Sequence, residues 1–503
     1  MNKLYINTIV ALISQILTII CGFVLPRFML LAYGSTINGL VSSISQFLGV
    51  ISFMQLGVGA VVQSTLYEPL IKKDSKKISE IYSSASNFFR TIAIIFSIYV
   101  VILMFVYPNT VASKFDFTFS FSLIFILAIS LFMQYYFGLT NQLLLYADQK
   151  AYIPLIVDVI SLLLNTFISI FLINNGFSIQ IVKICSSIIY IMRPIILSIY
   201  VKNKYEINKH ITYDEEPIKQ KWNGLTQHVA STVMDNTDIM ILTVFSSLDN
   251  VSIYYVYNLV VFGIRQLVTS LTVGLQSYFG SIYVQYDSRY VKNVFTIIEF
   301  IFHFLITVLF TCVIFLIVPF VSVYTFGIKD LNYNVPLFAF IISLSQAFYC
   351  YRLVYYTMIK AAGHFRQTQK SAVIEMILNI TISIFCVVKF GLVGVAIGTL
   401  LAVIYRTIYF IYYLHKNIIY IELKKTFFRF STDILIIVFL YFFLSKNCLS
   451  EFNYLSWFIL AIKVFIVVLV VTFIFNLLEM LFFERSVLTE ITHKISERIN
   501  KDD

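Results

Sequence analysis

Long runs of apolar residues, each roughly twenty residues or more, recur along the whole chain. A helix of this length spans the ~30 Å hydrocarbon core of a membrane, and lipid excludes backbone structures that leave polar groups unsatisfied. The runs are 7–32, 38–64, 88–107, 119–141, 153–173, 177–200, 223–245, 251–279, 294–320, 335–358, 369–388, 391–414, 431–445 and 455–482. They predict an all-α integral membrane protein with about fourteen transmembrane helices.

The composition agrees with this prediction. Hydrophobic residues make up 59% of the 503 residues, charged residues make up 12%, and the mean hydropathy is +0.87. Soluble domains contain roughly 25% charged residues, so this chain has about half the usual supply. All the cysteines except Cys448 lie inside apolar runs and no two form a CxxC motif, so we expect small apolar side chains and not disulfides or metal ligands.

The positive charges predict an orientation in the membrane. With a cytoplasmic N-terminus, the connecting segments that lie inside hold about six times as many Lys and Arg residues as those outside. The outside segments hold Lys114, Lys329, Lys389 and Lys446. This asymmetry predicts a multi-pass protein of the cytoplasmic (inner) membrane with both termini cytoplasmic. It also explains the net charge of +10 without nucleic acid as a partner.

An internal repeat predicts the domain organisation. Asn165–Phe171 (NTFISIF) resembles Asn379–Phe385 (NITISIF) at an offset of 214 residues, and the same offset carries 31–40 onto 245–254. We therefore expect two parallel six-helix repeats, a plan found in transporters with a midplane cavity. The predicted parts are an N-terminal repeat (1–200), a cytoplasmic linker (201–222), a C-terminal repeat (223–414), two additional helices (415–483) and a cytoplasmic tail (484–503).

Charged residues inside apolar runs are candidate site residues, because a charge costs ~2.5–3.5 kcal/mol or more at the bilayer centre. Run seven carries His228, Asp235 and Asp238 in or beside one polar stripe, which faces either a water-filled lumen or a neighbouring helix. Arg265 lies in the middle of run eight, where it can grip a phosphate bidentately or pair with Asp235 or Asp238. Arg352 in run ten has the same two interpretations.

Other charged residues suit ion coupling or simple anchoring. Glu299 and His303 lie four residues apart, so they can share a coupling proton or form a plain hydrogen bond on one helix face. Asp158 and Glu375 occupy similar places in the two repeats and can carry a proton, bind Na⁺, or pair with Arg193 and Arg406. Some charges near the ends of runs can extend to the membrane surface as anchors. These are Arg27, Arg193, Arg406, Asp433 and Glu479.

Motifs for catalysis are missing from the sequence. It contains no Walker A, HExxH or GxSxG motif and no DxD motif in a loop, and none of the predicted outside loops approaches the size of a domain. Membrane glycosyltransferases and polysaccharide polymerases usually need such loops. We therefore expect a protein that is not an enzyme and that uses no cofactor or metal.

Several segments resemble a known family. They are the glycine-containing run Gly39–Gly59, the basic loop Leu70–Ile78, Asp235–Leu242 and Val251–Tyr255. In these segments the chain resembles bacterial polysaccharide flippases for O-antigen, capsule or exopolysaccharide repeat units. That family belongs to the multidrug/oligosaccharidyl-lipid/polysaccharide (MOP) exporter superfamily. The likeness extends over essentially the whole chain in helix count, loop pattern and repeat.

The resemblance implies a function and a set of residues. It implies alternating-access transport of undecaprenyl-diphosphate-linked oligosaccharide to the outer leaflet, coupled to H⁺ or Na⁺, with the pathway's polymerase and glycosyltransferases and membrane lipids as partners. The candidates for diphosphate or sugar binding are Arg265, Arg27, Arg352, His228, Asp235 and Asp238. The candidates for ion coupling are Asp158, Asp238, Glu299, His303 and Glu375. The alternatives are a multidrug/cation antiporter of the same fold and, less in keeping with the loops, a membrane glycosyltransferase or polymerase.

Overall fold

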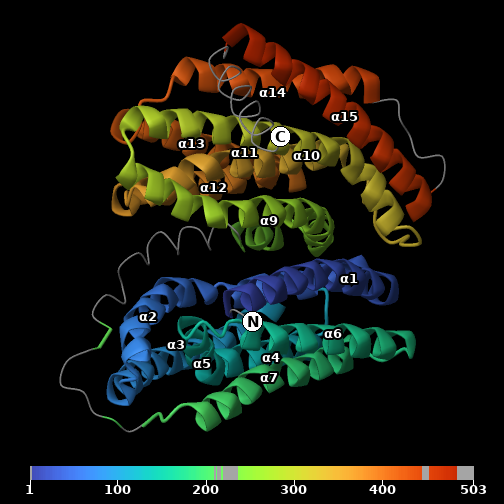
Figure 1. Cartoon of the computed structure of the whole chain (residues 1–503). Coiled ribbons are helices and arrows are strands. Elements are labelled where there is room, and N and C mark those ends of the chain that lie inside the picture. The colour runs from blue at the N-terminus through green and yellow to red at the C-terminus, as the bar shows by residue number, and fades with distance from the viewer. Residues whose placement is uncertain (1–2, 209–210, 212–216, 219–235, 445–451, 484–503) are drawn as a thin grey trace. The chain divides into compact units, whose positions relative to one another are not determined.

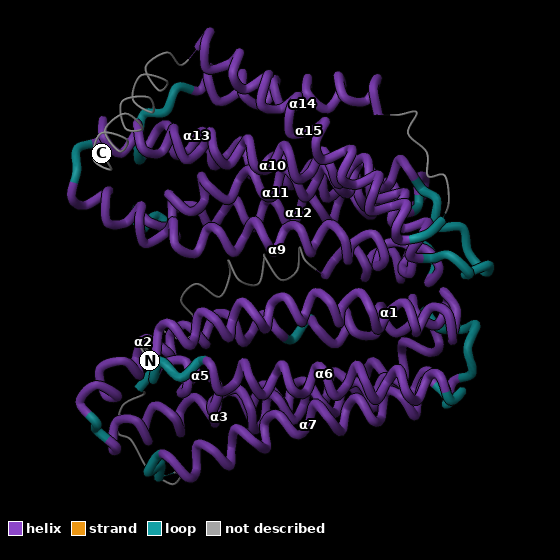
Figure 2. Tube along the Cα trace, turned by 45° about the vertical axis from the view of Figure 1, so that its right-hand side comes forward, coloured by secondary structure: helices purple, strands orange, loops and turns teal. Residues whose placement is uncertain are grey.

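The computed structural model describes residues 3–208, 211, 217–218, 236–444 and 452–483, and these residues form helices joined by short loops, with no strand among them (Figures 1 and 2). Twelve of the described helices are long and apolar enough to span a membrane. One of these, Ile9–Gly49, holds most of the first predicted run and the start of the second, and more than half of run seven lies outside the described residues. The prediction of an all-α membrane protein is confirmed.

Helix α1 (Lys3–Gly49) continues through the first predicted loop and bends at Gly34. This residue has φ 81° and ψ 172°, a conformation that glycine adopts without the steric cost of a side chain. The offset of 214 residues places Gly34 over Leu248, where helix α9 (Leu248–Gln285) begins. Both copies of the predicted repeat therefore interrupt the chain at the same point.

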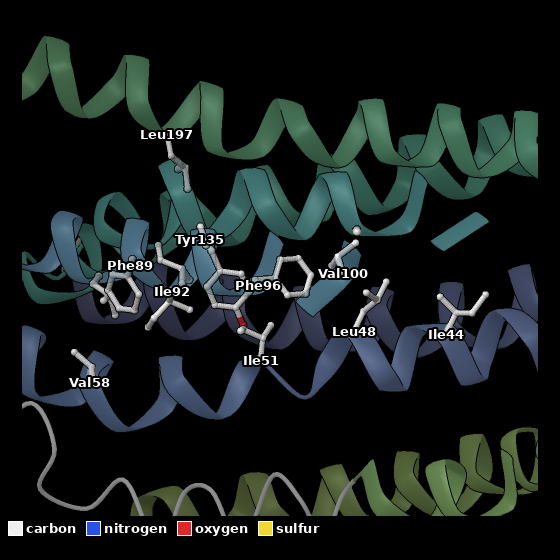
Figure 3. Packing of buried hydrophobic residues seen from close by; sticks show 14 of the residues in the cluster. Ile44, Leu48, Ile51, Val58, Phe89, Ile92, Phe96, Val100, Tyr135 and Leu197 are labelled. Atoms are coloured by element: carbon white, nitrogen blue, oxygen red, sulfur yellow. The ribbon is translucent and has the colours of Figure 1, made fainter. Parts of the chain in front are cut away.

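The chain forms two compact units, and the first comprises Met1–Tyr255 with Gly327–Leu331. Its helices after α1 are α2 (Ser52–Lys72), α3 (Ser75–Thr110), α4 (Phe117–Met133), α5 (Leu139–Ala147), α6 (Tyr152–Asn174), α7 (Ile179–Lys204) and the short helix Asn236–Phe245. Helix α6 packs against α1 and α7, and α4 packs against α3 and α7. Figure 3 shows the core of this unit, where Phe89 and Phe96 of α3 lie near Tyr135 and Leu197.

A π-helical turn, Gln134–Gly138, separates α4 from α5 inside the fourth predicted run. Such a turn carries one extra residue and changes the direction of the side chains that follow it. Tyr135 is buried there, and a Cβ on Gly138 would lie 2.7 Å from the side chain of Gln134 and 3.1 Å from Pro194. The glycine thus gives these side chains room. The apolar run 119–141 contains no signal for this turn.

The second unit comprises Val256–Phe326 and Asn332–Asp503, as far as these are described. After α9 its helices are α10 (Ser288–Tyr324), α11 (Pro336–Ala361), α12 (Phe365–Phe390), α13 (Leu392–Asn417), α14 (Leu423–Leu444) and α15 (Tyr454–Phe483). Helix α13 packs against α11 and α12, and α15 packs against α10 and α14. The expected span 431–445 is wrong at its start, because α14 begins eight residues earlier. The longer helix can include the charged residue Arg429, because this side chain is buried inside the protein and paired with Glu299.

Large apolar side chains remain exposed along the helices of both units. Phe167 of α6 is 72% exposed, Phe385 of α12 is 74% exposed and Leu455 of α15 is 70% exposed. A soluble protein rarely shows extended apolar surfaces of this kind, whereas lipid solvates them at no cost. The surface therefore agrees with a multi-pass membrane protein.

Candidate functional site

In the second unit, side chains from three helices meet at one glutamate and form what is here called the arginine cluster. Glu375 of α12 is fully buried, and its two carboxylate oxygens accept hydrogen bonds from Arg352 of α11 and Arg406 of α13, the latter at 2.5 Å. Two buried guanidinium groups thus share one carboxylate, which leaves a surplus of positive charge. Because such a surplus is costly in a poorly solvated interior, the cluster favours a further anion.

Arg265 of α9 extends this cluster. Its guanidinium carbon lies 4.1 Å from the ring centre of Tyr349, and that of Arg352 lies 4.2 Å from the same ring. Arg265 also donates a long hydrogen bond of 3.4 Å to Gln346 Oε1, and it is half-buried. Two arginines stacked on one ring repel each other, so a multiply charged anion beside them would relieve that repulsion.

Helix α11 carries different polar residues on two faces. Gln346 and Tyr349 contact Arg265, and Arg352 contacts Glu375, so these three residues belong to the arginine cluster. Tyr351 and Tyr355 instead contact residues of α10. One helix therefore contributes to two separate groups of buried polar side chains.

The second group, here called the acidic cluster, consists of Glu299, His303, Arg429, Asp433 and Glu479. Arg429 of α14 is 1% exposed, and it donates to Glu299 Oε2 at 2.9 Å and to Glu479 Oε1 of α15 at 3.2 Å. Thr426 donates to Glu299 Oε1 at 3.1 Å. The cluster thus joins α10 to the two additional helices α14 and α15.

His303 lies between Asp433 and Tyr355 in the same cluster. Its Nδ1 is 2.7 Å from Asp433 Oδ2, and its Nε2 is 3.3 Å from the Tyr355 hydroxyl. Tyr355 donates to Glu299 Oε1 at 2.5 Å, so the predicted link between Glu299 and His303 runs through a tyrosine. Asp433 was expected as an anchor near the end of a span. It is instead buried, because α14 begins at Leu423 and places Asp433 in its third turn.

The two predicted repeats carry related pairs. In the first unit Arg193 approaches Asp158 at 3.5 Å, and in the second unit Arg406 contacts Glu375. Asn165 Nδ2 donates to the Tyr190 hydroxyl at 3.0 Å. The corresponding Asn379 Nδ2 donates to Thr399 Oγ1 at 2.8 Å. The donors Asn165 and Asn379 correspond at the offset of 214, but their acceptors do not, so the internal repeat stays a prediction.

The remaining predicted site residues are placed as follows. Arg27 is half-buried on α1, and Asp238 is buried and accepts a hydrogen bond of 2.8 Å from Tyr254. His228 and Asp235 lie outside the described residues. The sequence reasoning missed Lys183 of α7, whose Nζ lies 3.6 Å from Met29 Sδ, although a single lysine inside the run 177–200 was a signal for it. Within the described part of the chain, no group of three or more His, Cys, Asp or Glu side chains is arranged to hold a metal ion.

Arg406 and Glu479 were also expected as anchors, and both are buried. Arg406 is 6% exposed and Glu479 is 5% exposed, and each contacts an oppositely charged partner inside the second unit. A paired charge can stay inside the protein, so it has no need to reach the membrane surface. Position near the end of a run was therefore a poor guide to their environment.

Several solved structures share this arrangement of helices. No family model and no curated protein matches the sequence. Among solved structures, the lipid II flippase MurJ in an inward closed conformation matches with a TM-score of 0.69 and 17% identity, over 93% of this chain and 97% of that one. The eukaryotic MATE transporter AtDTX14 matches with a TM-score of 0.53 and 13% identity, over 82% and 96% of the two chains. A MATE in complex with MaD5 matches with a TM-score of 0.51 and 15% identity, over 79% and 93%. The chain is therefore an all-α membrane protein with the fold of the lipid II flippase MurJ and the MATE transporters.

Proposed function

We propose that this protein is a flippase that moves polyprenyl-diphosphate-linked oligosaccharide repeat units from the inner to the outer leaflet of the cytoplasmic membrane. It acts by alternating access, with both termini in the cytoplasm, and supplies the synthesis of a cell-surface polysaccharide. Glycosyltransferases and a polymerase of the same pathway precede and follow it. The fold supports this proposal, since the similar protein MurJ is named as a lipid II flippase.

The arginine cluster carries the proposal. A diphosphate brings at least two negative charges, and guanidinium groups bind such oxygens with paired, charge-assisted hydrogen bonds. Arg352 and Arg406 exceed the charge of Glu375, and Arg265 lies on the same aromatic ring as Arg352. A cationic drug would be repelled at this place. The cluster therefore favours the flippase over a multidrug or cation antiporter of the same fold.

Arg265 is the arginine best suited to a test. Arg352 and Arg406 also hold Glu375, so their loss would disturb the packing of α11, α12 and α13. Arg265 contacts Gln346 and the rings of Tyr349 and Phe262, beside the two arginines that hold Glu375. We assign it the first contact with the diphosphate. Arg27, His228, Asp235 and Asp238 stay predicted lumen residues.

The test is complementation of a deletion strain. Deletion should trap undecaprenyl-diphosphate-linked repeat units in the inner leaflet. Arg265→Ala should restore flipping at least roughly tenfold less well than the wild type, because a charge-assisted hydrogen bond contributes about 1.5–3 kcal/mol. Arg366→Ala, at an exposed arginine of α12, should restore it fully.

Two results would contradict the proposal at different points. Normal outer-leaflet repeat units with raised drug sensitivity in the deletion strain would favour the antiporter. Full activity of a well-expressed Arg265→Ala variant would remove Arg265 from the site and leave the flippase assignment standing.

A further inference from the structure

The hydrogen bonds around His303 fix the number of protons that they need. Tyr355 has one hydroxyl proton, and its shorter contact, 2.5 Å to Glu299 Oε1, takes it. The Tyr355 oxygen can then only accept from His303 Nε2, which lies 3.3 Å away. On the other side of the ring, His303 Nδ1 faces Asp433 Oδ2 at 2.7 Å, so a proton must lie between these two atoms.

All these contacts are satisfied together when one extra proton is present. A neutral imidazole has a single N–H, so it can serve Asp433 or Tyr355 but not both. With a second proton, held by the imidazole or shared with Asp433, both ring nitrogens have partners. Loss of that proton breaks one hydrogen bond.

The same proton balances the charge of the pair. Asp433 is 4% exposed and His303 is fully buried, and His303 is the one titratable base within hydrogen-bond distance of Asp433 among the described residues. Without the extra proton, the pair holds one buried negative charge. With it, the pair is neutral overall, which a poorly solvated interior favours.

The surroundings add negative charge, because two carboxylates share one guanidinium, and this further favours a proton on the pair. Arg429 on α14 pairs with Glu299 of α10 and Glu479 of α15. From α11, Tyr351 contacts Thr307, and Thr307 donates to Asp433 Oδ1 at 2.5 Å. These groups belong to α10, α11, α14 and α15.

A small cavity beside Asp433 and Thr311 has room for water. Its volume of about 20 Å³ is enough for one water molecule, and it is bounded by Thr307, Thr311, Tyr351 and Asp433 together with apolar side chains. Thr311 is fully buried, and its hydroxyl has no hydrogen-bond partner among the described residues. A water bonded to Thr311 and Asp433 would satisfy that hydroxyl and accept the departing proton.

We propose that His303 and Asp433 form a proton-binding site, and that its loading and unloading couples a proton gradient to flipping. The proton leaves from His303 Nδ1 through Asp433 to a water in the cavity, and Asp433 keeps the negative charge. The site uses α14, so it assigns the two additional helices a part in coupling. The coupling step rests on the proposed flippase function, whereas proton binding itself does not.

The first experiment observes the proton directly. Purified full-length protein with ¹⁵N-labelled histidine is placed in lipid nanodiscs, and the His303 signal is identified as the one missing from His303→Gln. We expect a doubly protonated ring in the wild type and a larger share of neutral ring in Asp433→Asn at the same pH. Asp148→Asn, which disturbs an acid–tyrosine–lysine group in the first unit, should leave the ring doubly protonated. A His303 ring that stays neutral from acidic to neutral pH would overturn the proposal.

The second experiment measures coupling in proteoliposomes with undecaprenyl-diphosphate carrying a fluorescent disaccharide. An imposed pH gradient should accelerate flipping by the wild type. Asp433→Asn should lose that acceleration while it still flips the lipid without a gradient. Thr311→Val should slow the response, and it stays informative if Asp433→Asn fails to fold, because Thr311 lies outside the hydrogen-bonded chain.

The outcomes separate the two proposals. If the wild type does not flip the lipid, the flippase proposal fails for this substrate and the histidine titration alone decides on the proton site. If the wild type responds to the pH gradient and both variants respond equally, the site assignment is wrong. Acceleration by a Na⁺ gradient in place of a pH gradient would also overturn it.

Discussion

Replacing Glu375 with Gln removes the charge that joins Arg352 to Arg406 while it keeps the shape of the side chain. Both guanidinium groups are less than a tenth exposed, so they would be left in the interior without their carboxylate. Breaking a buried ion pair in this way costs roughly 3–5 kcal/mol. We expect Glu375→Gln to lose free energy of unfolding in that range, which lowers the ratio of folded to unfolded protein by at least about a hundredfold.

The first repeat provides a matched control. Asp158 is 38% exposed and Arg193 is 25% exposed, and their charged atoms lie 3.5 Å apart. Because this pair is less buried and its contact is longer, we expect Asp158→Asn to lose less free energy of unfolding than Glu375→Gln. Unfolding is followed by circular dichroism in mixed micelles with increasing SDS, and the double variant Glu375→Gln/Arg406→Gln should recover part of the loss. Equal losses for Glu375→Gln and Asp158→Asn would refute the reasoning from burial.

Two further predictions concern packing and pH. A Cβ at Gly39 would lie 1.9 Å from the backbone oxygen of Leu248, whereas a Cβ at Gly22 would meet nothing within 4 Å. Gly39→Ala should therefore cost about 1–3 kcal/mol and lower the yield of monodisperse protein, and Gly22→Ala should not; equal yields would contradict this. Hydrogen bonds from Lys425 and then Lys292 lower the pKa of Glu422 below its usual 4.5. Ionised Glu422 therefore stabilises the folded protein above pH 4.5, and this stabilisation is lost as the pH falls through the lowered pKa. Thermal unfolding of Glu422→Gln should show a smaller loss on acidification than the wild type, and an equal loss would refute the pairing.

The apolar runs were sufficient to predict the class of fold, because the thickness of the membrane sets the length of each helix. They were insufficient for helix ends. The run 431–445 was too short, since Lys424, Lys425 and Arg429 look like loop residues in a hydropathy pattern although α14 includes them. That error also moved Asp433 from the interior to the predicted surface.

Partners of buried charges were harder to predict than the charges themselves. The repeat did point to Asp158 with Arg193 and to Glu375 with Arg406, because equivalent places share an arrangement. By contrast, Arg429 pairs with Glu299 across 130 residues of sequence, and no local pattern relates the two. The second arginine on Glu375 was missed for the same reason.

Helix α11 contains both Arg352, which contacts Glu375, and Tyr355, which contacts Glu299 and His303. The two residues are three apart, about 4.5 Å along the helix axis. A helix turns or slides as a rigid rod, so a rotation that pulls Tyr355 away from His303 also shifts Arg352 against Glu375. A movement at one cluster can therefore change the contacts of the other through the rigid helix, without a chain of intervening side chains. Substitutions at Arg352 and Tyr355 should then give non-additive effects on flipping in a double-mutant cycle.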